Sequence, residues 1–268
     1  MDGDVLYMRP VKRFGQNFLV NGAIARIEAA HAIGRGVIEI GPGYGILTKE
    51  LCKVADSVIA VERDRSLFRH LKSAIKSRKL TLINADFFGV PGDEIIRTGN
   101  EILISNVPYN LSSKTIEWLA EKGIEAVLCL QKEFVDRMLA KHGSDDYSRL
   151  SVTTSLMFSV TRIINVGRGN FRPMPKVDSA IVYMKPKKSA VSREDLRIIG
   201  LLMQHKNKTL KKAVVDSRRS ICSNERAVVS LSDTLKLKSS RVFALSPDEL
   251  LGVSRDIQSF ISGIGNCA

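Results

Sequence analysis

The chain has 268 residues, of which 41 are Lys or Arg and 28 are Asp or Glu, so its formal net charge is +13 at pH 7. Apolar residues make up 44% and charged residues 26% of the chain, which excludes a disordered, collagen-like or low-complexity protein. No apolar run approaches the roughly 20 residues of a membrane-spanning helix. The first ten residues hold two acids and no apolar signal-peptide core. We therefore expect a cytoplasmic protein with no membrane partner.

The cysteines and histidines indicate no metal site. The four cysteines lie far apart without a CxxC pair, and the four histidines lack the spacing of metal ligands. We expect neither a disulfide nor a structural metal. The excess of positive charge is common among nucleic-acid-binding proteins, although a basic surface without such a partner would have the same composition.

A linker-like segment divides the chain near residues 185–192. Up to Met184 the chain has 25 basic and 20 acidic residues, and beyond it 16 basic and 8 acidic. The shorter part therefore carries the larger excess of charge. The join is rich in Lys, contains Pro186, and lies between a strand pattern and a helical pattern. We predict a large domain over residues 1–187 and a small one over residues 188–268.

The large domain alternates short β-branched runs with amphipathic segments, which is the pattern of βαβ units on a parallel sheet. The predicted strands are 37–40, 57–61, 80–84, 102–105, 126–130, 163–166 and 179–184. The predicted helices are 46–53, 66–77, 112–121 and 132–141, followed in the small domain by 192–205 and 208–220. The pattern predicts a doubly wound α/β sheet. Its ligands would bind beyond the carboxyl ends of the strands.

A glycine-rich turn follows the first predicted strand. Gly41, Gly43 and Gly45 lead into a helix, and glycine lets the backbone approach a ligand closely. The dinucleotide fingerprint GxGxxG would need a glycine where this chain has Ile46. The spacing therefore favours a turn around a nucleoside over a pyrophosphate-binding loop. A plain tight turn stays open as the alternative.

Carboxylates follow the next two predicted strands. Glu62 lies about 20 residues beyond the glycine turn, where an acid hydrogen-bonds the hydroxyls of a ribose. Asp86 follows the third strand, where its carboxylate could accept a hydrogen bond from the amino group of an adenine. Either acid could instead cap the helix that follows it, and Asp64 could take that capping role beside Glu62.

The segment after the fourth predicted strand carries the clearest chemistry, and it reads Asn106-Val107-Pro108-Tyr109-Asn110. The exocyclic amine of a nucleobase is a poor nucleophile, because its lone pair is delocalised into the ring. Hydrogen-bond acceptors that favour a pyramidal nitrogen would activate it. The side-chain oxygen of Asn106 and a carbonyl next to Pro108 can supply them, and Tyr109 offers a face on which an extruded base can stack. A simple turn is the alternative.

Five different sequence motifs occur in order between residues 12 and 184. They are an arm at 12–19, the glycine turn at 39–48, the loop at 106–110, the segments 131–133 and 147–152, and Phe-x-Pro-x-Pro-Lys-Val-Asp-Ser at 171–179. Together they resemble the S-adenosylmethionine-dependent ribosomal RNA adenine N6,N6-dimethyltransferases, most closely the small-subunit type. The match Lys208-Thr209-Leu210 is weaker. Residues 145–149 resemble archaeal members.

The resemblance implies a Rossmann-like class I methyltransferase sheet over residues 1–187, with residues 1–20 as an arm over the cofactor, and a helical RNA-docking domain over residues 188–268. It implies that S-adenosyl-L-methionine is bound by Asn17, Leu19, Gly41, Gly43, Glu62, Asp86 and Asn106. The implied catalytic residues are Asn106, Pro108, Tyr109 and Phe171. Tyr109 and Phe171 would stack on the two faces of a flipped adenine. Val107 stands where the catalytic loop of this family more commonly has Leu. The change is conservative, because the chemistry uses the neighbouring backbone carbonyl and not this side chain.

The resemblance also implies the reaction. The substrate is a pair of adjacent adenines in a hairpin loop near the 3′ end of small-subunit (16S) ribosomal RNA, within an immature 30S-type subunit. The methyl group passes directly to N6 until each adenine carries two, and S-adenosyl-L-homocysteine is the product. No metal is required. We expect a monomer.

Basic residues cluster near the start of the small domain, with Asp216 as the one acid among them. The cluster is Lys206, Lys208, Lys211, Lys212, Arg218 and Arg219. Beside a methyltransferase domain, it is interpreted as a set of contacts to RNA phosphates. A solvated helix face is the alternative.

Two other functions stay open. A related methyltransferase dimethylates a large-subunit ribosomal adenine, and the motif at 171–179 with Lys208-Thr209-Leu210 favours the small-subunit type over it. The protein could also act mainly as a nucleic-acid-binding assembly or transcription factor. Intact Asn106, Tyr109, Phe171 and Glu62 argue against lost catalysis but leave room for a binding role beside it.

Overall fold

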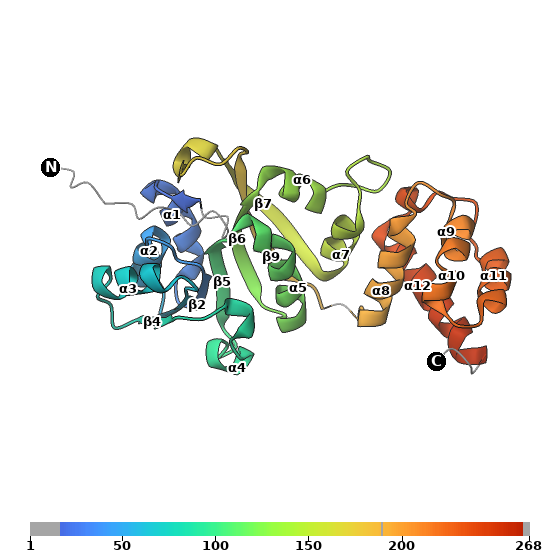
Figure 1. Ribbon diagram of the computed structural model, residues 1–268, viewed down its shortest axis with the longest axis horizontal. Helices are drawn as coiled ribbons and strands as arrows, with labels where there is room; N and C mark the ends of the chain where they lie inside the picture. Colours follow the sequence, from blue (N-terminus) through green and yellow to red (C-terminus); the bar gives the residue numbers. More distant parts are fainter. Residues whose placement is uncertain (1–16, 189, 265–268) are drawn as a thin grey trace. The chain divides into compact units, whose positions relative to one another are not determined.

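The computed structural model describes residues 17–188 and 190–264, so most of the predicted N-terminal arm lies outside the described residues. Seven strands form one sheet in the order β4-β3-β2-β5-β6-β9-β7 (Figure 1). Their bounds are Gly36–Ile40 (β2), Ser57–Val61 (β3), Leu80–Ile83 (β4), Glu101–Asn106 (β5), Glu125–Gln131 (β6), Phe158–Val166 (β7) and Ser179–Pro186 (β9). All seven predicted strands are confirmed. A separate pair, Phe18–Leu19 (β1) and Phe171–Arg172 (β8), was not predicted.

The order of the strands creates a crevice at the middle of the sheet. β2 pairs in parallel with β3 on one side and with β5 on the other, while β9 returns antiparallel to β6. The chain therefore reverses its winding direction between β2 and β5. At such a switch point the loops that leave adjacent strands diverge, and a ligand fits between them. Ile40 and Asn106, the last residues of β2 and β5, face this place.

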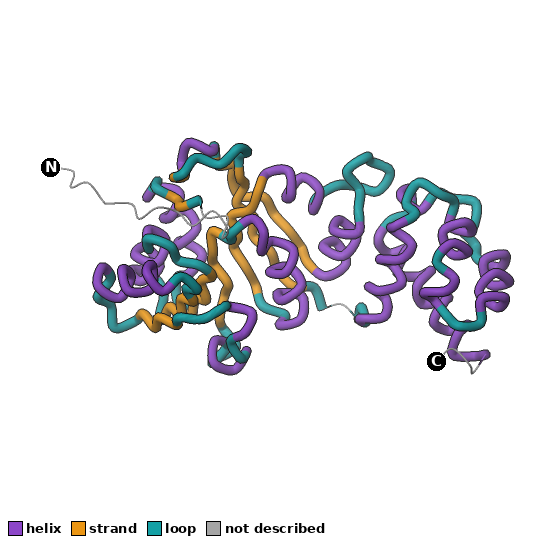
Figure 2. The backbone as a smooth tube through the Cα atoms, in the orientation of Figure 1, coloured by secondary structure: helices purple, strands orange, loops and turns teal. Residues whose placement is uncertain are grey.

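The central strands are buried along nearly their whole length, as expected for a parallel sheet with both faces covered. On one face Val37, Ile102 and Val127 form a hydrophobic core with Ile24 and Leu51 from two helices. These helices are α1 (Gly22–Ala29) and α2 (Ile46–Val54). The remaining helices around the sheet are α3 (Arg65–Ala74), α4 (Gly92–Ile95), α5 (Ser112–Lys122) and α6 (Lys132–Met138). Figure 2 shows the strands side by side with helices flanking them.

Helix α1 was not predicted, and the helix predicted over 132–141 ends early. Asn21 caps α1, because its side chain accepts a hydrogen bond from the N–H of Ala23. After α6 ends at Met138, a loop with Gly143 at φ 83° leads to Ser148, which forms a capping box with Ser151. This box starts α7 (Arg149–Met157), which was missed because its sequence has little amphipathic periodicity.

The chain divides into two compact units by its own contacts. One contains the residues up to Val135 and Val160–Pro186, and the other contains Asp136–Ser159 and the chain from Lys187 onward. The prediction placed residues 136–159 in the large domain, whereas their contacts join them to the second unit. The functional assignment of the two domains stays a prediction.

The second unit is helical in its C-terminal part. Its helices there are α8 (Arg193–Gln204), α9 (Leu210–Asp216), α10 (Arg218–Ile221), α11 (Glu225–Thr234) and α12 (Pro247–Ile264). Ser217 interrupts the single helix that was predicted over 208–220. Tyr147, Leu202 and Val214 lie in its hydrophobic core. Cys222 is disulfide-bonded, contrary to expectation. No helix among the described residues is long and apolar enough to cross a bilayer.

Asp195 connects two helices of this unit. Its carboxylate accepts hydrogen bonds from the N–H and hydroxyl of Ser192 at the start of α8, and from Ser254 and Gln258 of α12. Burial by itself would raise the pKa of Asp195, but these hydrogen bonds outweigh it and hold the pKa below its usual value. The ionised form is therefore favoured in the folded protein.

We expect Asp195→Ala to lower the free energy of unfolding by about 3 kcal/mol at pH 7, because several hydrogen bonds to a charged acceptor are lost. The folded-state pKa is depressed, so the contribution is complete above the unfolded-state pKa and disappears as the pH falls through the folded-state pKa. Denaturant titrations at pH 7 and near pH 3 should show a smaller difference from wild type in acid. Glu194→Ala, which removes an exposed pair with Arg197, should change stability by less than about 1 kcal/mol. A difference between wild type and Asp195→Ala that is independent of pH would contradict this role.

Candidate active site

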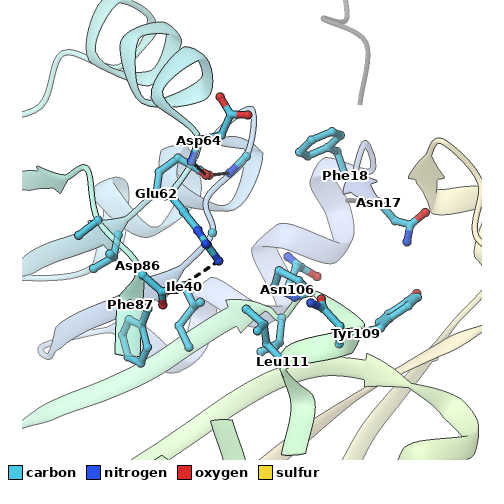
Figure 3. Close-up of a pocket in the computed structure, with 18 residues that line it drawn as sticks. Asn17, Phe18, Ile40, Glu62, Asp64, Asp86, Phe87, Asn106, Tyr109 and Leu111 are labelled. Atoms are coloured by element: carbon cyan, nitrogen blue, oxygen red, sulfur yellow. Dashed lines mark hydrogen bonds and ion pairs between the residues drawn. The ribbon is translucent and has the colours of Figure 1, made fainter. Parts of the chain in front are cut away.

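A cleft lies at the switch point of the sheet, beyond the carboxyl ends of its strands. It encloses about 870 Å³ of empty space, part of it open to solvent, within the range of small-molecule sites. Figure 3 shows Glu62 and Asp86 on one side and Asn106 and Tyr109 on the other, with Phe18 near the mouth. The residues predicted from sequence that line it are Asn17, Gly41, Gly43, Glu62, Asp86, Asn106, Pro108 and Tyr109.

The glycine turn forms one wall through its backbone. Gly41, Gly43 and Gly45 all have positive φ, at 61°, 59° and 80°, a conformation that costs residues with a Cβ about 1–2 kcal/mol. A Cβ on Gly43 would lie 2.6 Å from Cδ1 of Phe18, whose ring meets Tyr44 edge-on. The three glycines are therefore required by backbone geometry, and at Gly43 and Gly45 also by close approach.

We expect Gly43→Ala to lower the affinity for S-adenosylmethionine by about 10-fold, because the left-handed backbone and the Phe18 ring both resist the added methyl group. Calorimetric titration with the cofactor measures this. Gly34→Ala is the matched control, since Gly34 has φ 70° but nothing within 4 Å of the added Cβ. Both variants should lose stability, but only Gly43→Ala should lose affinity. Equal affinity in the two variants would show that the turn does not shape the site.

Glu62 lines the cleft and does not cap the helix that follows it. Asp64, not Glu62, caps α3, because its carboxylate accepts from the N–H groups of Ser66 and Leu67. Glu62 is only 5% exposed, and its two oxygens accept from the N–H groups of Gly43 at 3.2 Å and Asp64 at 2.8 Å. A carboxylate offers about four acceptor sites in all. The acid is thus fixed at the cleft wall with acceptor capacity left over.

Asp86 takes one of the two roles that the sequence left open. One carboxylate oxygen accepts from the N–H of Phe88 and caps the short helix that follows. The other lies 3.2 Å from the guanidinium of Arg63. Asp86 also lines the cleft beside Phe87 (Figure 3). A helix-capping role is therefore present, and an adenine-binding role stays a prediction.

Three buried carboxylates lie in or next to this region: Glu62 lines the cleft, Glu39 lines an adjoining cavity, and Glu28 contacts Asn106, which lines both. Burial raises the pKa of Glu39 to about 8, opposed by the hydroxyl of Thr48 and reinforced by the charge of Glu62. Burial also raises the pKa of Glu62, against the N–H groups of Asp64 and Gly43. A cationic ligand nearby would favour the ionised forms of these acids. The site is therefore suited to a positively charged ligand.

Glu28 was not identified from the sequence. The only signal is an acid on the face of α1 that otherwise buries Ile24, Ala25 and Ala29. A Glu on an apolar helix face is unusual unless it has a partner. In the structure that partner is Asn106, whose Nδ2 donates to Oε2 of Glu28 at 3.1 Å.

The loop after β5 carries the predicted reaction chemistry. Ser105 fixes the end of β5 by donating to the carbonyl of Ile40 at 2.8 Å. Asn106 Oδ1 is buried and has no hydrogen-bond partner among the described residues. The hydroxyl of Tyr109 bonds with that of Ser179 at 2.8 Å, which fixes the tyrosine ring while the residue lines the cleft. The amide and the aromatic ring are thus presented to the same space.

Phe171 does not line the cleft, although it was predicted to stack on an adenine opposite Tyr109. It is 2% exposed and packs in the hydrophobic core with Leu19 and Ile24. The reason is the β1–β8 pair, in which Leu19 lies opposite Phe171. Leu19 itself lines only the adjoining cavity. The two-sided stack is therefore not formed in this structure, and a role for Phe171 would require its ring to leave the core.

The basic cluster of the second unit is largely paired within the protein. Lys208 pairs with Asp216 and Lys211 with Asp233, while Arg218 and Arg219 share Glu225. Lys206 donates to the carbonyls of Asp145 and Tyr147. Lys206 and Lys212 make no ion pair with the residues that the structure describes, and of the six only Lys212 has no side-chain partner among them. Exposed pairs of this kind are weak and can exchange partners, so RNA contact by these residues stays a prediction.

Comparison with known proteins identifies the family. The family model for ribosomal RNA adenine dimethylase matches residues 9–245. The chain belongs to the ribosomal RNA adenine dimethylase family. The match spans both the α/β sheet and much of the helical part. A Rossmann-like methyltransferase fold with a helical C-terminal part is thereby confirmed.

Individual curated proteins and solved structures are similar to most of the chain. A probable ribosomal RNA small subunit methyltransferase A of Thermococcus gammatolerans is 35% identical over 92% of this chain and 88% of its own. The ribosomal RNA small subunit methyltransferase A of Mycoplasmopsis pulmonis is 36% identical over 76% of this chain and 82% of its own. The crystal structure of a dimethyladenosine transferase from Plasmodium falciparum has a TM-score of 0.77 at 26% identity, covering 91% of this chain and 98% of that one. The 23S rRNA methyltransferase ErmE has a TM-score of 0.59 at 24% identity, covers 90% of this chain and all of that one, and shares the fold.

Proposed function

We propose that this chain dimethylates N6 of two adjacent adenines in a hairpin loop near the 3′ end of small-subunit ribosomal RNA, with S-adenosylmethionine as methyl donor. The observation that carries the proposal is Asn106 Oδ1, a buried acceptor without a partner among the described residues, at the cleft between Glu62 and Tyr109. An unpaired buried acceptor is costly unless a ligand completes it. The family and its small-subunit relatives support this choice of substrate.

The cleft residues fit S-adenosylmethionine. Glu62 would accept from the ribose hydroxyls, Asp86 from the adenine amino group, and the glycine turn would lie against the methionine part. The buried carboxylates would attract the positive sulfonium. When bound, the cofactor supplies an electrophilic methyl group, so the reaction requires no metal.

The protein's residues would act by positioning and by hydrogen bonding. Oδ1 of Asn106 and the carbonyl of Val107 would accept the two N–H groups of the target amine, and Tyr109 would stack on the extruded base. A nitrogen–carbon bond forms as the carbon–sulfur bond breaks, and the methylated amine then loses a proton to solvent. Acceptors that are already oriented stabilise the developing positive charge on nitrogen.

The remaining assignments extend the same proposal. Residues 188–268 would dock RNA, with Lys206, Lys208, Lys211, Lys212, Arg218 and Arg219 meeting phosphates. Each would exchange an internal partner for a phosphate, except Lys212, which has none to give up among the described residues. The substrate would be an immature 30S-type subunit in the cytoplasm, bound by a monomer.

A methylation assay tests the function. The purified chain is incubated with labelled S-adenosylmethionine and either small or large ribosomal subunits that lack the modification, and modified bases are mapped. Two adjacent N6,N6-dimethyladenines near the 3′ end of the small-subunit RNA are expected. A single dimethylated adenine in the large-subunit RNA would identify the other type of methyltransferase. Binding to subunits without methyl transfer would indicate an assembly factor.

A further inference from the structure

The carboxylate of Glu28 is buried against the catalytic amide. Glu28 has no exposed surface, and its one hydrogen bond joins Oε2 to Nδ2 of Asn106 at 3.1 Å. Its second oxygen, Oε1, has no partner among the described residues. Because Glu28 comes from α1 and Asn106 from the end of β5, the fold brings together two residues that are 78 positions apart.

Stability does not explain this arrangement. A buried carboxylate normally accepts several hydrogen bonds or pairs with a cation, since burial of an unpaired charge is unfavourable. Asp195 and Glu101 follow that rule, each with several donors. Glu28 has a single donor, and an apolar residue would fill its place on α1 without leaving a charge in the core.

We propose that Glu28 is a positioning residue that fixes which way the Asn106 amide faces; this rests on the proposed function of Asn106 as the acceptor for the target amine. An asparagine side chain has two orientations, with NH₂ and oxygen exchanged. A carboxylate can only accept, so it holds the NH₂ group on its own side. Oδ1 is then left on the other corner of the amide, free to accept.

Charge strengthens the same effect. A carboxylate that accepts from one end of an amide polarises it and makes its oxygen a stronger acceptor. Such an acceptor interacts more favourably with an amine that becomes cationic during methyl transfer. Protonated Glu28 would lose this advantage, and its new O–H could donate to Oδ1 and reverse the amide.

The surroundings of Glu28 raise its pKa into the pH range in which activity can be measured. Burial raises the pKa of Glu28 to about 8, opposed by the hydrogen bond from Asn106 and reinforced by the charge of Glu39. The other titratable group that interacts with it is the thiol of Cys129 on β6, whose pKa is raised by its own burial and by Glu28. Activity should therefore rise with pH as Glu28 ionises, and a bound sulfonium would shift that rise to lower pH.

Glu28→Gln and Glu28→Met test the proposal in the full-length protein. Gln keeps the shape but can present either its oxygen or its NH₂ group to Asn106, and Met can do neither. With small subunits that lack the modification, we expect kcat to fall about 10-fold for Gln, because a charge-assisted hydrogen bond becomes a neutral one. For Met, kcat should fall about 100-fold, which is the usual effect of removing one oriented hydrogen-bonding group from an active site. The affinity for S-adenosylmethionine should fall much less than kcat in both variants, since only a charge near the sulfonium is lost and the ribose site is unchanged.

The pH profile separates positioning from a structural effect. The profile of kcat in wild type should contain an ionisation that is absent from Glu28→Gln. Glu101→Gln is the matched control: Glu101 is a buried Glu that also has an unpaired oxygen, but it lies outside the cleft. This control should lose stability and keep the wild-type kcat and profile. If Glu28→Gln keeps the wild-type kcat and profile, or loses cofactor affinity as much as turnover, the proposal is wrong.

A pH titration that does not depend on methyl transfer tests the Glu28 contact independently of the proposed function. The side-chain NH₂ signals of Asn106, assigned by their absence from Asn106→Asp, should shift in nuclear magnetic resonance spectra of wild type as Glu28 titrates. In Glu28→Gln, these NH₂ signals should show no shift at the pH where Glu28 titrates in wild type. If wild type methylates no ribosomal subunit, the function proposed above fails, while this titration still decides the Glu28 contact. NH₂ signals that do not respond to pH would overturn the contact.

Discussion

Asn106→Ala is expected to lower the rate of methyl transfer by about 100- to 1000-fold, the usual cost of removing one oriented group that stabilises developing charge. The variant would lack the proposed acceptor for the target N6 amine, and it would leave Glu28 without its only hydrogen-bond donor among the described residues. The affinity for S-adenosylmethionine should fall much less, because the ribose and adenine contacts proposed for Glu62 and Asp86 would remain. Single-turnover methylation of small subunits and calorimetric titration of the cofactor measure the two effects separately.

Asn100→Ala is the control for this prediction. Asn100 precedes β5 at the opposite end from Asn106, and its exposed side chain donates to the carbonyl of Gly34. Its loss should leave turnover unchanged. Near-normal turnover of Asn106→Ala on its ribosomal substrate would overturn the mechanism. A loss of cofactor affinity as large as the loss of rate would instead make Asn106 mainly a cofactor-binding residue.

The strands and the loops at their ends could be predicted because local physics dominates there. A parallel strand buried on both faces needs a largely apolar run; 126–130 is wholly apolar, and 37–40 and 102–105 contain one polar residue each, Glu39 and Ser105. Once the strands are located, topology alone gathers the residues that follow them. Gly41, Glu62 and Asn106 therefore meet in one cleft although they lie far apart in sequence.

Features that depend on contacts between distant segments could not be predicted. A pair of two-residue strands has no periodicity to detect, so the β1–β8 pair and the burial of Phe171 were missed. Apart from Asp216, the acids that pair with the basic cluster were also missed, because Asp233 reaches Lys211 from α11. Glu28 belongs with these cases: its neighbours in sequence indicate an apolar face, and only the fold places Asn106 beside it.

Glu62→Ala is expected to weaken binding of S-adenosylmethionine by about 100-fold. Two ribose hydroxyls would lose hydrogen bonds to a charged acceptor, each contributing about 1.5 kcal/mol or more, and the N–H of Gly43 would lose its acceptor. The ribose is common to S-adenosylmethionine and S-adenosylhomocysteine, so the affinities for both should fall by similar factors. Calorimetric titration with each compound provides the comparison.

A selective loss of S-adenosylmethionine affinity would mean that Glu62 acts through its charge on the sulfonium instead. Glu125→Ala is the matched control, since Glu125 begins β6 and pairs with Arg35 and Tyr183 at the other end of the sheet. It should lower stability without changing either affinity. Glu125 would then be a residue that stabilises the sheet, and Glu62 one that the sheet positions for ligand binding. In Glu62 the protein's own N–H groups occupy only part of the acceptor capacity, so lone pairs remain that a ribose can use.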